Sequence, residues 1–240
     1  MATPGELVHC IASMLKVPVP TVVQYDRNLA AAGLRSKGGR GLSAARVTSQ
    51  DAANLLIAIV GAPMSGATVK ETLATWHRFS PLRADLGNSP LSASDFSHWK
   101  RELPTLSRLR KRHTFRDAIA ALIDSAARGE FENSVNNPVS RTRNDSRIRL
   151  PRVYISISAP LIGAHISVQP AGADHSPIVA YRPKEAERHA DTYGDLSQQR
   201  TISLRTILTI AQTIGPPEKR SRRRRARPDT RKERLAARPK

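Results

Sequence analysis

The chain has 240 residues, of which 39% are hydrophobic and 25% are charged. This leaves room for one large domain or two small ones with a real core, and it excludes a collagen, a disulfide scaffold and a wholly disordered chain. Thirty-nine Lys and Arg residues face twenty Asp and Glu residues, and the net charge of +19 makes a polyanion the first partner to consider. GC-rich coding also favours Arg over Lys, so charge alone names no ligand.

Several classes of function are disfavoured by what the sequence lacks. The single cysteine, Cys10, excludes an internal disulfide and a thiolate metal cluster, and it fits a reducing compartment. The histidines lack zinc-ligand spacing, and there is no Gly-x-Ser-x-Gly motif. Residues 61–66 have the glycines of a phosphate-binding loop, but Ala67 stands where that loop needs Lys. No apolar run is long enough to span a membrane. We therefore predict a cytoplasmic protein that is not an enzyme, with no metal site, no cofactor and no membrane contact.

The N-terminal region carries clear helix signals. Thr3 and Glu6 have the spacing of a capping box, with a proline at the first helical position between them. A second helix begins near Pro20 and ends at Gly33, where a left-handed conformation is easy. Only about four residues, 16–19, connect the two, and this predicts a helix-turn-helix.

A basic, glycine-rich segment follows, and then two more helices. Residues 34–47 contain three glycines, four basic side chains and no acid, which predicts a loop or short hairpin. Thr48 or Ser49 then caps a helix that ends at Gly61, and Thr68 opens another. These later helices are expected to cover the apolar faces of the first two.

The second half changes period. Apolar and polar residues alternate over 153–158 and 164–169, which predicts an antiparallel hairpin, and residues 178–181 are expected to add a strand. Residues 202–214 have helical spacing. Residues 216–240 carry a net charge of +9 and one large apolar side chain, so this tail should be disordered, and +10 remains on the rest.

We therefore expect an α+β protein. Its parts, in chain order, are a helical domain with helix-turn-helix and wing (1–79), a linker or mobile loop with a short helix near 94–102 (80–112), a helix (113–131), a flexible loop (132–147), a small α+β unit (148–215) and a disordered Arg-rich tail (216–240).

Over residues 4–47, the order of helix, short turn, helix, glycine and basic glycine-rich loop resembles the winged helix-turn-helix domains of bacterial and phage DNA-binding regulators. The resemblance implies that the second helix enters the major groove while the loop, as the wing, follows the backbone or minor groove.

The candidate DNA-binding residues lie on the second helix and the loop. Gln and Asn amides can pair with the edge of adenine, Thr can contact phosphate or a thymine methyl, and loop cations can neutralise phosphates. The predicted contacts are Thr21, Gln24, Tyr25, Arg27, Asn28, Arg35, Lys37, Arg40 and Arg46. The alternative is an ordinary solvated helix face followed by a flexible surface loop.

The tail favours non-specific attraction to phosphate. Its predicted contacts are Arg222, Arg223, Arg224, Arg225 and Arg227. RNA is an alternative ligand because arginine-rich segments order on RNA, and a generic solubility tail is a further alternative.

We predict sequence-specific binding to double-stranded DNA, by a transcriptional regulator of the prophage or mobile-element type. One alternative is a non-specific nucleic-acid-binding or DNA-packaging adaptor protein dominated by the tail. Another is a protein-interaction module that uses residues 148–215.

Overall fold

The computed structural model describes residues 2–36, 46–63, 68–85, 103–131, 152–169, 178–183 and 197–216. These residues form an α+β fold, as the sequence predicts. The helices are α1 (Pro4–Leu15), α2 (Val19–Ala31), α3 (Ser49–Val60), α4 (Val69–Phe79), α6 (Pro104–Ser107), α7 (Phe115–Ala127) and α9 (Leu204–Ile214). The strands are β1 (Arg83–Ala84), β2 (Arg152–Ala159), β3 (Gly163–Gln169), β4 (Ile178–Arg182) and β5 (Gln198–Ser203).

Capping by a threonine sets where α1, α3, α4 and α7 begin. A threonine precedes each of α1, α3, α4 and α7, and its hydroxyl accepts a hydrogen bond from the backbone N–H three residues later. In α1, α3 and α7 the acidic residue at that later position returns the bond, which completes a capping box. The predicted starts of α1, α3 and α4 are confirmed, and α7 is the helix expected within residues 113–131.

The five strands form one antiparallel sheet in the order β1-β4-β3-β2-β5. The predicted hairpin is confirmed, with Ile155 opposite Ile166 in the β2–β3 register. The predicted third strand is β4, which pairs with β3. The alternation turns the apolar side chains of β2 and β3 to one face, where Val153, Ile155 and Ile166 are at most 1% exposed.

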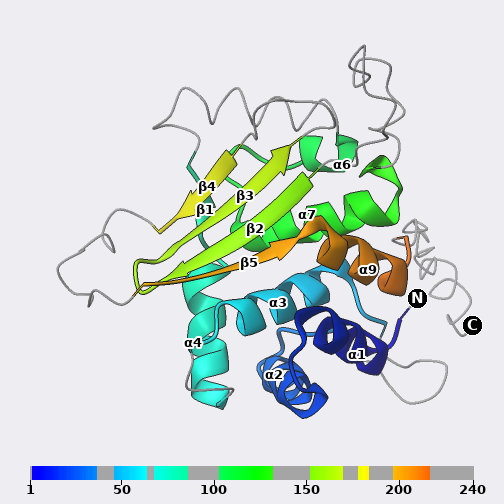
Figure 1. Ribbon diagram of the computed structural model, residues 1–240, viewed down its shortest axis with the longest axis vertical. Helices are drawn as coiled ribbons and strands as arrows, with labels where there is room; N and C mark the ends of the chain where they lie inside the picture. The colour runs from blue at the N-terminus through cyan, green and yellow to red at the C-terminus, as the bar shows by residue number, and fades with distance from the viewer. Residues whose placement is uncertain are drawn as a thin grey trace, which may run out of the picture.

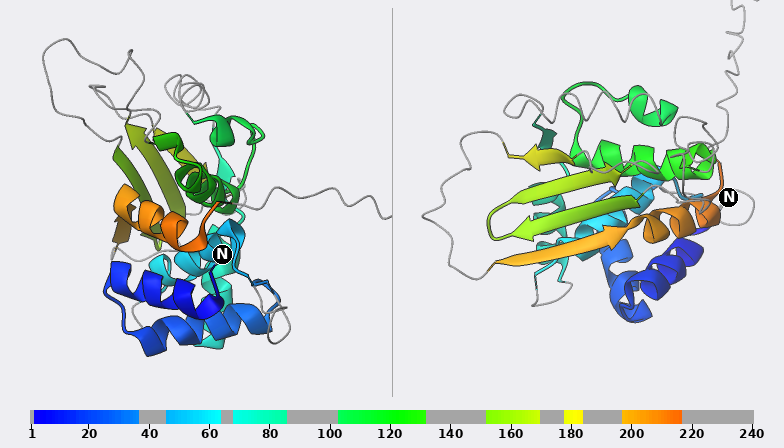
Figure 2. Two further views of the ribbon diagram at one scale, coloured as in Figure 1. Left: turned by 90° about the vertical axis from the view of Figure 1, so that its right-hand side faces the viewer. Right: turned by 45° about the horizontal axis from the view of Figure 1, so that its top comes forward.

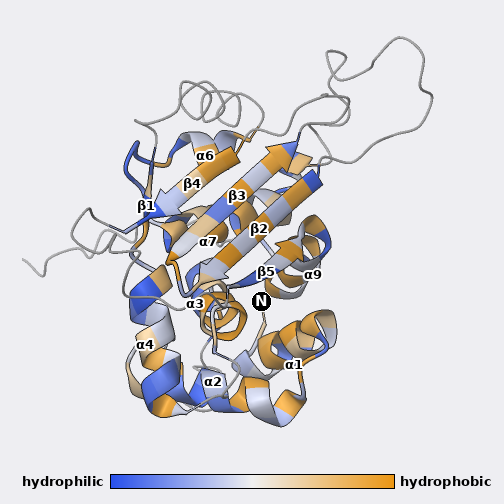
Figure 3. Cartoon of the chain, turned by 60° about the vertical axis from the view of Figure 1, so that its left-hand side comes forward, coloured by the Kyte–Doolittle hydropathy of each residue, from blue (hydrophilic) through white to orange (hydrophobic). Residues whose placement is uncertain are grey.

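Helices α7 and α9 cover that apolar face, and no helix covers the other face within the described ranges (Figures 1 and 2). Helix α3 lies behind them and contacts α7, α9, α2 and α4. All residues from Asp51 to Val60 are buried, and α3 is accordingly one of the most hydrophobic helices in Figure 3. Helices α1, α2 and α4 occupy the end of the molecule away from the sheet (Figure 1).

The described residues share a single hydrophobic core, which runs from Leu7 on α1 to Ile214 on α9. The segment 80–112, expected as a linker between two domains, supplies β1 and α6 instead. Strand β1 pairs with β4, with Arg83 opposite Arg182, so this segment belongs to the sheet. The separation into an N-terminal domain and a C-terminal unit is therefore not what the structure has.

Other differences from expectation are smaller. The last helix begins at Leu204, because Ile202 is held in β5 by pairing with Ile155 of β2. The expected short helix near 94–102, the loop 132–147 and tail residues 217–240 lie outside the described residues. None of the helices described combines the length and the apolarity needed to cross a bilayer.

Candidate nucleic-acid interface

The predicted close connection between the first two helices is present. Lys16 ends α1 in a left-handed conformation with φ 55°, and α2 begins at Val19 after Pro18. The Val17 N–H donates to the Ala12 carbonyl at 3.1 Å, which turns the chain back at once. As a result α1 and α2 pack against each other across a very short turn.

The end of α2 is set by glycine. Gly33 has φ 73°, a conformation that costs other residues energy because of their Cβ. The Gly33 N–H donates to the Ala30 carbonyl at 3.1 Å and the Leu34 N–H donates to the Leu29 carbonyl at 2.9 Å. These are the two bonds of a Schellman motif, and they start the basic segment in a fixed direction.

Two of the predicted DNA contacts on α2 are buried. Tyr25 is 4% exposed and Asn28 is 3% exposed, so the expectation that both lie on the outer face of α2 is wrong. The reason is that α2 contacts α1, α3 and α4. Three neighbouring helices bury more of the circumference of α2 than its apolar residues alone indicate. Burial also raises the pKa of the Tyr25 hydroxyl.

The outer face of α2 is narrower than predicted. Gln24 and Arg27 are exposed and lie three residues apart, which places them on the same side of the helix. Thr21 is half-buried beside them. The side chains that α2 can present to a partner therefore include one amide and one guanidinium.

The Gln24 amide is held in a defined orientation. The Thr72 hydroxyl donates to the Thr68 carbonyl at 2.7 Å, so its oxygen accepts from Asn28 Nδ2 at 2.9 Å. Asn28 Oδ1 then accepts from Gln24 Nε2 at 2.9 Å. The Thr72 hydroxyl has one hydrogen, which it donates to Thr68, so it can only accept from Asn28. This determines which end of the Asn28 amide is oxygen, and hence that the Gln24 amide donates to it. The Gln24 side chain keeps its carbonyl oxygen and one amide hydrogen for a further partner.

The first cation of the basic segment is paired within the fold. Arg35 Nε lies 3.1 Å from Asp26 Oδ1, and the two side chains are 21% and 12% exposed. Burial raises the pKa of Asp26, while the positive charge of Arg35 opposes this effect and the carboxylate of Asp51 adds to it. Arg35 therefore ties the segment to α2 and is not the uncompensated cation that the sequence indicated.

Asp51 holds the two stems of the basic loop together. Its Oδ1 accepts from the Ser36 N–H at 2.7 Å, and its Oδ2 accepts from the N–H and hydroxyl of Thr48 at 2.8 Å each. The Val47 N–H also donates to the Ala2 carbonyl at 3.0 Å. One carboxylate at the start of α3 thus joins Ser36 to Thr48.

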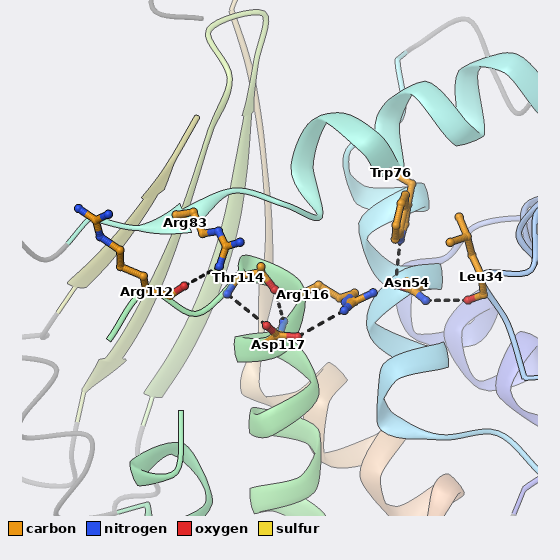
Figure 4. Close-up of polar contacts among 8 residues, drawn as sticks. All are labelled: Leu34, Asn54, Trp76, Arg83, Arg112, Thr114, Arg116 and Asp117. Carbon is orange, nitrogen blue, oxygen red and sulfur yellow. Dashed lines mark hydrogen bonds and ion pairs between the residues drawn. The ribbon is translucent and has the colours of Figure 1, made fainter. Parts of the chain in front are cut away.

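Asn54 on α3 also binds the turn that follows α2. Its Nδ2 donates to the Leu34 carbonyl at 2.7 Å, and its Oδ1 accepts from Trp76 Nε1 at 2.8 Å (Figure 4). The side chain is 5% exposed, so both hydrogen bonds are shielded from water. Helices α3 and α4 and the turn after α2 are thereby locked to one another.

The remaining predicted contacts divide into two groups. Arg46 is exposed just before α3. Lys37 and Arg40, with the rest of the expected wing, lie outside the described residues, as do Arg222, Arg223, Arg224, Arg225 and Arg227 of the tail.

Sequence reasoning missed the residues that position this surface. Asp51 was not among the predicted site residues, and its bond to Ser36 spans 15 residues. Asn54 and Thr72 carried no signal, because polar residues inside a helix are normally solvated. Their burial is visible only once the helices are packed.

The described residues contain no group of His, Cys, Asp and Glu side chains that could hold a metal ion. Comparison of the chain with protein-family models, curated proteins and solved structures finds no match.

Proposed function

We propose that the N-terminal helices and the basic loop bind double-stranded DNA and read its sequence, as a transcriptional regulator does. The observation that carries this proposal is the orientation of Gln24 on the outer face of α2, beside exposed Arg27. A glutamine amide can donate to N7 and accept from N6 of adenine, a pairing that other bases do not offer in the major groove. An amide fixed before binding loses less entropy than a free one.

In this proposal each part of the surface has its own role. Gln24 contacts a base edge, and Arg27 contacts phosphate on one side of it. Asn28 is a positioning residue that acts through Gln24. Lys37 and Arg40 of the basic loop supply further phosphate contacts, in the manner of a wing.

The test begins with selection of bound sites from a random duplex library by the full chain. Gln24→Ala is expected to lose discrimination at a single base pair, by about 1–3 kcal/mol. Arg27→Ala and the double variant Lys37→Ala/Arg40→Ala are expected to weaken binding to all sequences and to lower the salt dependence, by roughly 0.9 log–log unit for each phosphate that is no longer neutralised. Gln212→Ala, an exposed amide on α9, is the matched control.

Two results would contradict the proposal. If no sequence is enriched in the selection, the chain does not read DNA. If Gln24→Ala weakens all duplexes equally, Gln24 touches only the backbone and the base-reading role fails.

A second candidate function is non-specific nucleic-acid binding through the tail, which is favoured by the net charge of +9 on residues 216–240. Removal of residues 217–240 separates the two functions. A sequence reader keeps its selected site after the removal, whereas a protein dominated by its tail loses most of its affinity for DNA and RNA alike.

A further inference from the structure

A second group of basic side chains lies on the turn between α6 and α7. Arg108, Arg110, Lys111 and Arg112 are all exposed. None of their side chains forms an ion pair within the described part of the chain. The run stands in the segment that the sequence indicated as a linker, but the structure holds it in place.

His113 fixes this turn to the sheet. It is 3% exposed, its Nδ1 lies 2.8 Å from the Arg110 carbonyl oxygen, and its Nε2 lies 2.8 Å from the Tyr181 hydroxyl. Since a carbonyl only accepts, Nδ1 carries the hydrogen, and in the neutral ring Nε2 accepts from Tyr181. The backbone bonds Ala84 N–H to His113 O, at 3.2 Å, and Phe115 N–H to Leu82 O, at 2.8 Å, flank this contact.

The edge of the sheet adds two arginines. Arg83 on β1 lies directly opposite Arg182 on β4. Arg83 Nη1 donates to the Arg112 carbonyl at 2.8 Å, and Figure 4 shows the Arg112 side chain extending away from this bond. Arg182 Nε lies 3.5 Å from Asp85 Oδ2. Like charges directly opposite each other on neighbouring strands destabilise a sheet. The Asp85 carboxylate offsets this repulsion beside Arg182, and the remaining positive charge of this edge favours the binding of an anion.

We call these six residues the distal basic patch: Arg83, Arg108, Arg110, Lys111, Arg112 and Arg182. It lies at the end of the molecule opposite α1 and α2, and the views agree on this separation (Figures 1 and 2). The patch and the outer face of α2 are therefore two separate surfaces of the molecule.

The chemistry of the patch suits a phosphate backbone. Five of the six cations are arginines, whose planar forks bind phosphate oxygens in pairs. The exposed large hydrophobic residues of the described chain are Val69, Tyr154, Leu161 and Ile178, and none belongs to the patch. Without an apolar centre the patch lacks the core of a typical protein interface.

We propose that the distal basic patch binds the backbone of a second segment of double-stranded DNA, so that one molecule bridges two segments. The proposal rests on DNA binding by the N-terminal end, which holds the first segment. It predicts no sequence preference for the second segment, because the patch offers cations without base-reading side chains.

The experiment measures bridging directly. The full chain is bound to a bead-immobilised duplex that carries the selected site, and capture of a fluorescent duplex of random sequence is recorded at about 150 mM salt. Arg110→Ala/Arg112→Ala is expected to lower capture at least about tenfold, because each charge-assisted contact is worth about that much. Affinity for the immobilised duplex should stay unchanged.

The control removes the same charge elsewhere. Arg128→Ala/Arg205→Ala alters two exposed arginines outside the patch and should leave capture intact. Both double variants keep the backbone bonds of their segments, and thermal unfolding checks their folding. Arg108→Ala/Lys111→Ala is the second patch variant and should lower capture in the same way.

The outcomes separate this inference from the proposed function. Bridging by the patch would be overturned if the patch variant and its control lost capture equally. It would also be overturned if capture were lost only when residues 217–240 are removed. A patch variant that weakens the first duplex as much as the second would also overturn it, since one composite surface would then bind both. If Gln24→Ala weakens all duplexes equally while capture still depends on the patch, only the sequence-reading role is refuted, and bridging stands.

Discussion

Asp26 and Arg35 form an ion pair across the turn that ends α2, with Nε 3.1 Å from Oδ1. The pair joins the helix that presents Gln24 to the start of the basic segment. Burial nevertheless raises the pKa of Asp26 above its ordinary 3.8, with the nearby carboxylate of Asp51 adding to the shift. The native state therefore holds the proton of Asp26 more tightly than the unfolded state does.

This raised pKa gives a defined pH dependence. The contribution of Asp26 to the free energy of unfolding is fully present below pH 3.8 and is lost as the pH rises through the native pKa. We therefore expect wild type to lose stability relative to Asp26→Asn as the pH rises from about 3 to about 7 in urea unfolding. A difference that grows in favour of wild type with rising pH would show that attraction to Arg35 outweighs burial.

Asp51→Asn should loosen both stems of the basic loop. An amide nitrogen would face backbone N–H donors that the carboxylate now satisfies, and the expected loss is about 1–2 kcal/mol of unfolding free energy. The amide of Ser36 should also exchange with solvent faster. Asp117→Asn is the matched control, because Asp117 completes the capping box of α7. Equal losses would show that the bond to Ser36 contributes nothing.

Thr72→Val should break the hydrogen-bond relay that orients Gln24. The change keeps the shape of the side chain but leaves the buried Nδ2 group of Asn28 without its bond to Thr72, at an expected cost of about 1–3 kcal/mol. Thr209→Val is the control, since the Thr209 hydroxyl donates only to the Arg205 carbonyl of its own helix. Chemical denaturation measures both, and an effect of similar size in the control would argue against the relay.

Gly61→Ala should destabilise the packing of α3 on α4. A Cβ at this position would lie 2.8 Å from Phe79 Cδ2 and 2.9 Å from Thr75 Cγ2. Overpacking of this kind costs about 1–3 kcal/mol. A methyl group at Gly163 would meet nothing within 4 Å, so Gly163→Ala is the matched control and should be close to neutral in a thermal melt. A neutral Gly61→Ala would mean that Phe79 can move aside freely.

Helices could be predicted from the sequence because their signals are local. The capping threonines and their acidic partners lie three residues apart and form their bonds within one turn. The β2–β3 hairpin was likewise marked by strict alternation. In these elements the local preference and the final packing agree.

The sequence-based predictions were wrong where contacts between residues far apart in the chain determine burial or strand pairing. The apolar stripe of α2 indicates one buried face, yet a third neighbouring helix also covers Tyr25 and Asn28. Strand β1 has two residues and β5 has Gln198, Gln199 and Arg200 in succession, so neither shows a strand period. Pairing with β4 and β2 defines these strands, and no local pattern encodes it.

The packing of α1 on α9 has a consequence for isolating the N-terminal end of the molecule. Cys10 Sγ on α1 lies at hydrogen-bond distance, 3.3 Å, from Thr213 Oγ1 on α9. Arg200 of β5 donates to the Ile59 carbonyl at 3.2 Å. A fragment cut after residue 79 would expose to solvent the apolar surfaces of α1 and α3 that now pack against α7 and α9. Such a fragment should aggregate or unfold, because the helical end and the sheet share one hydrophobic core.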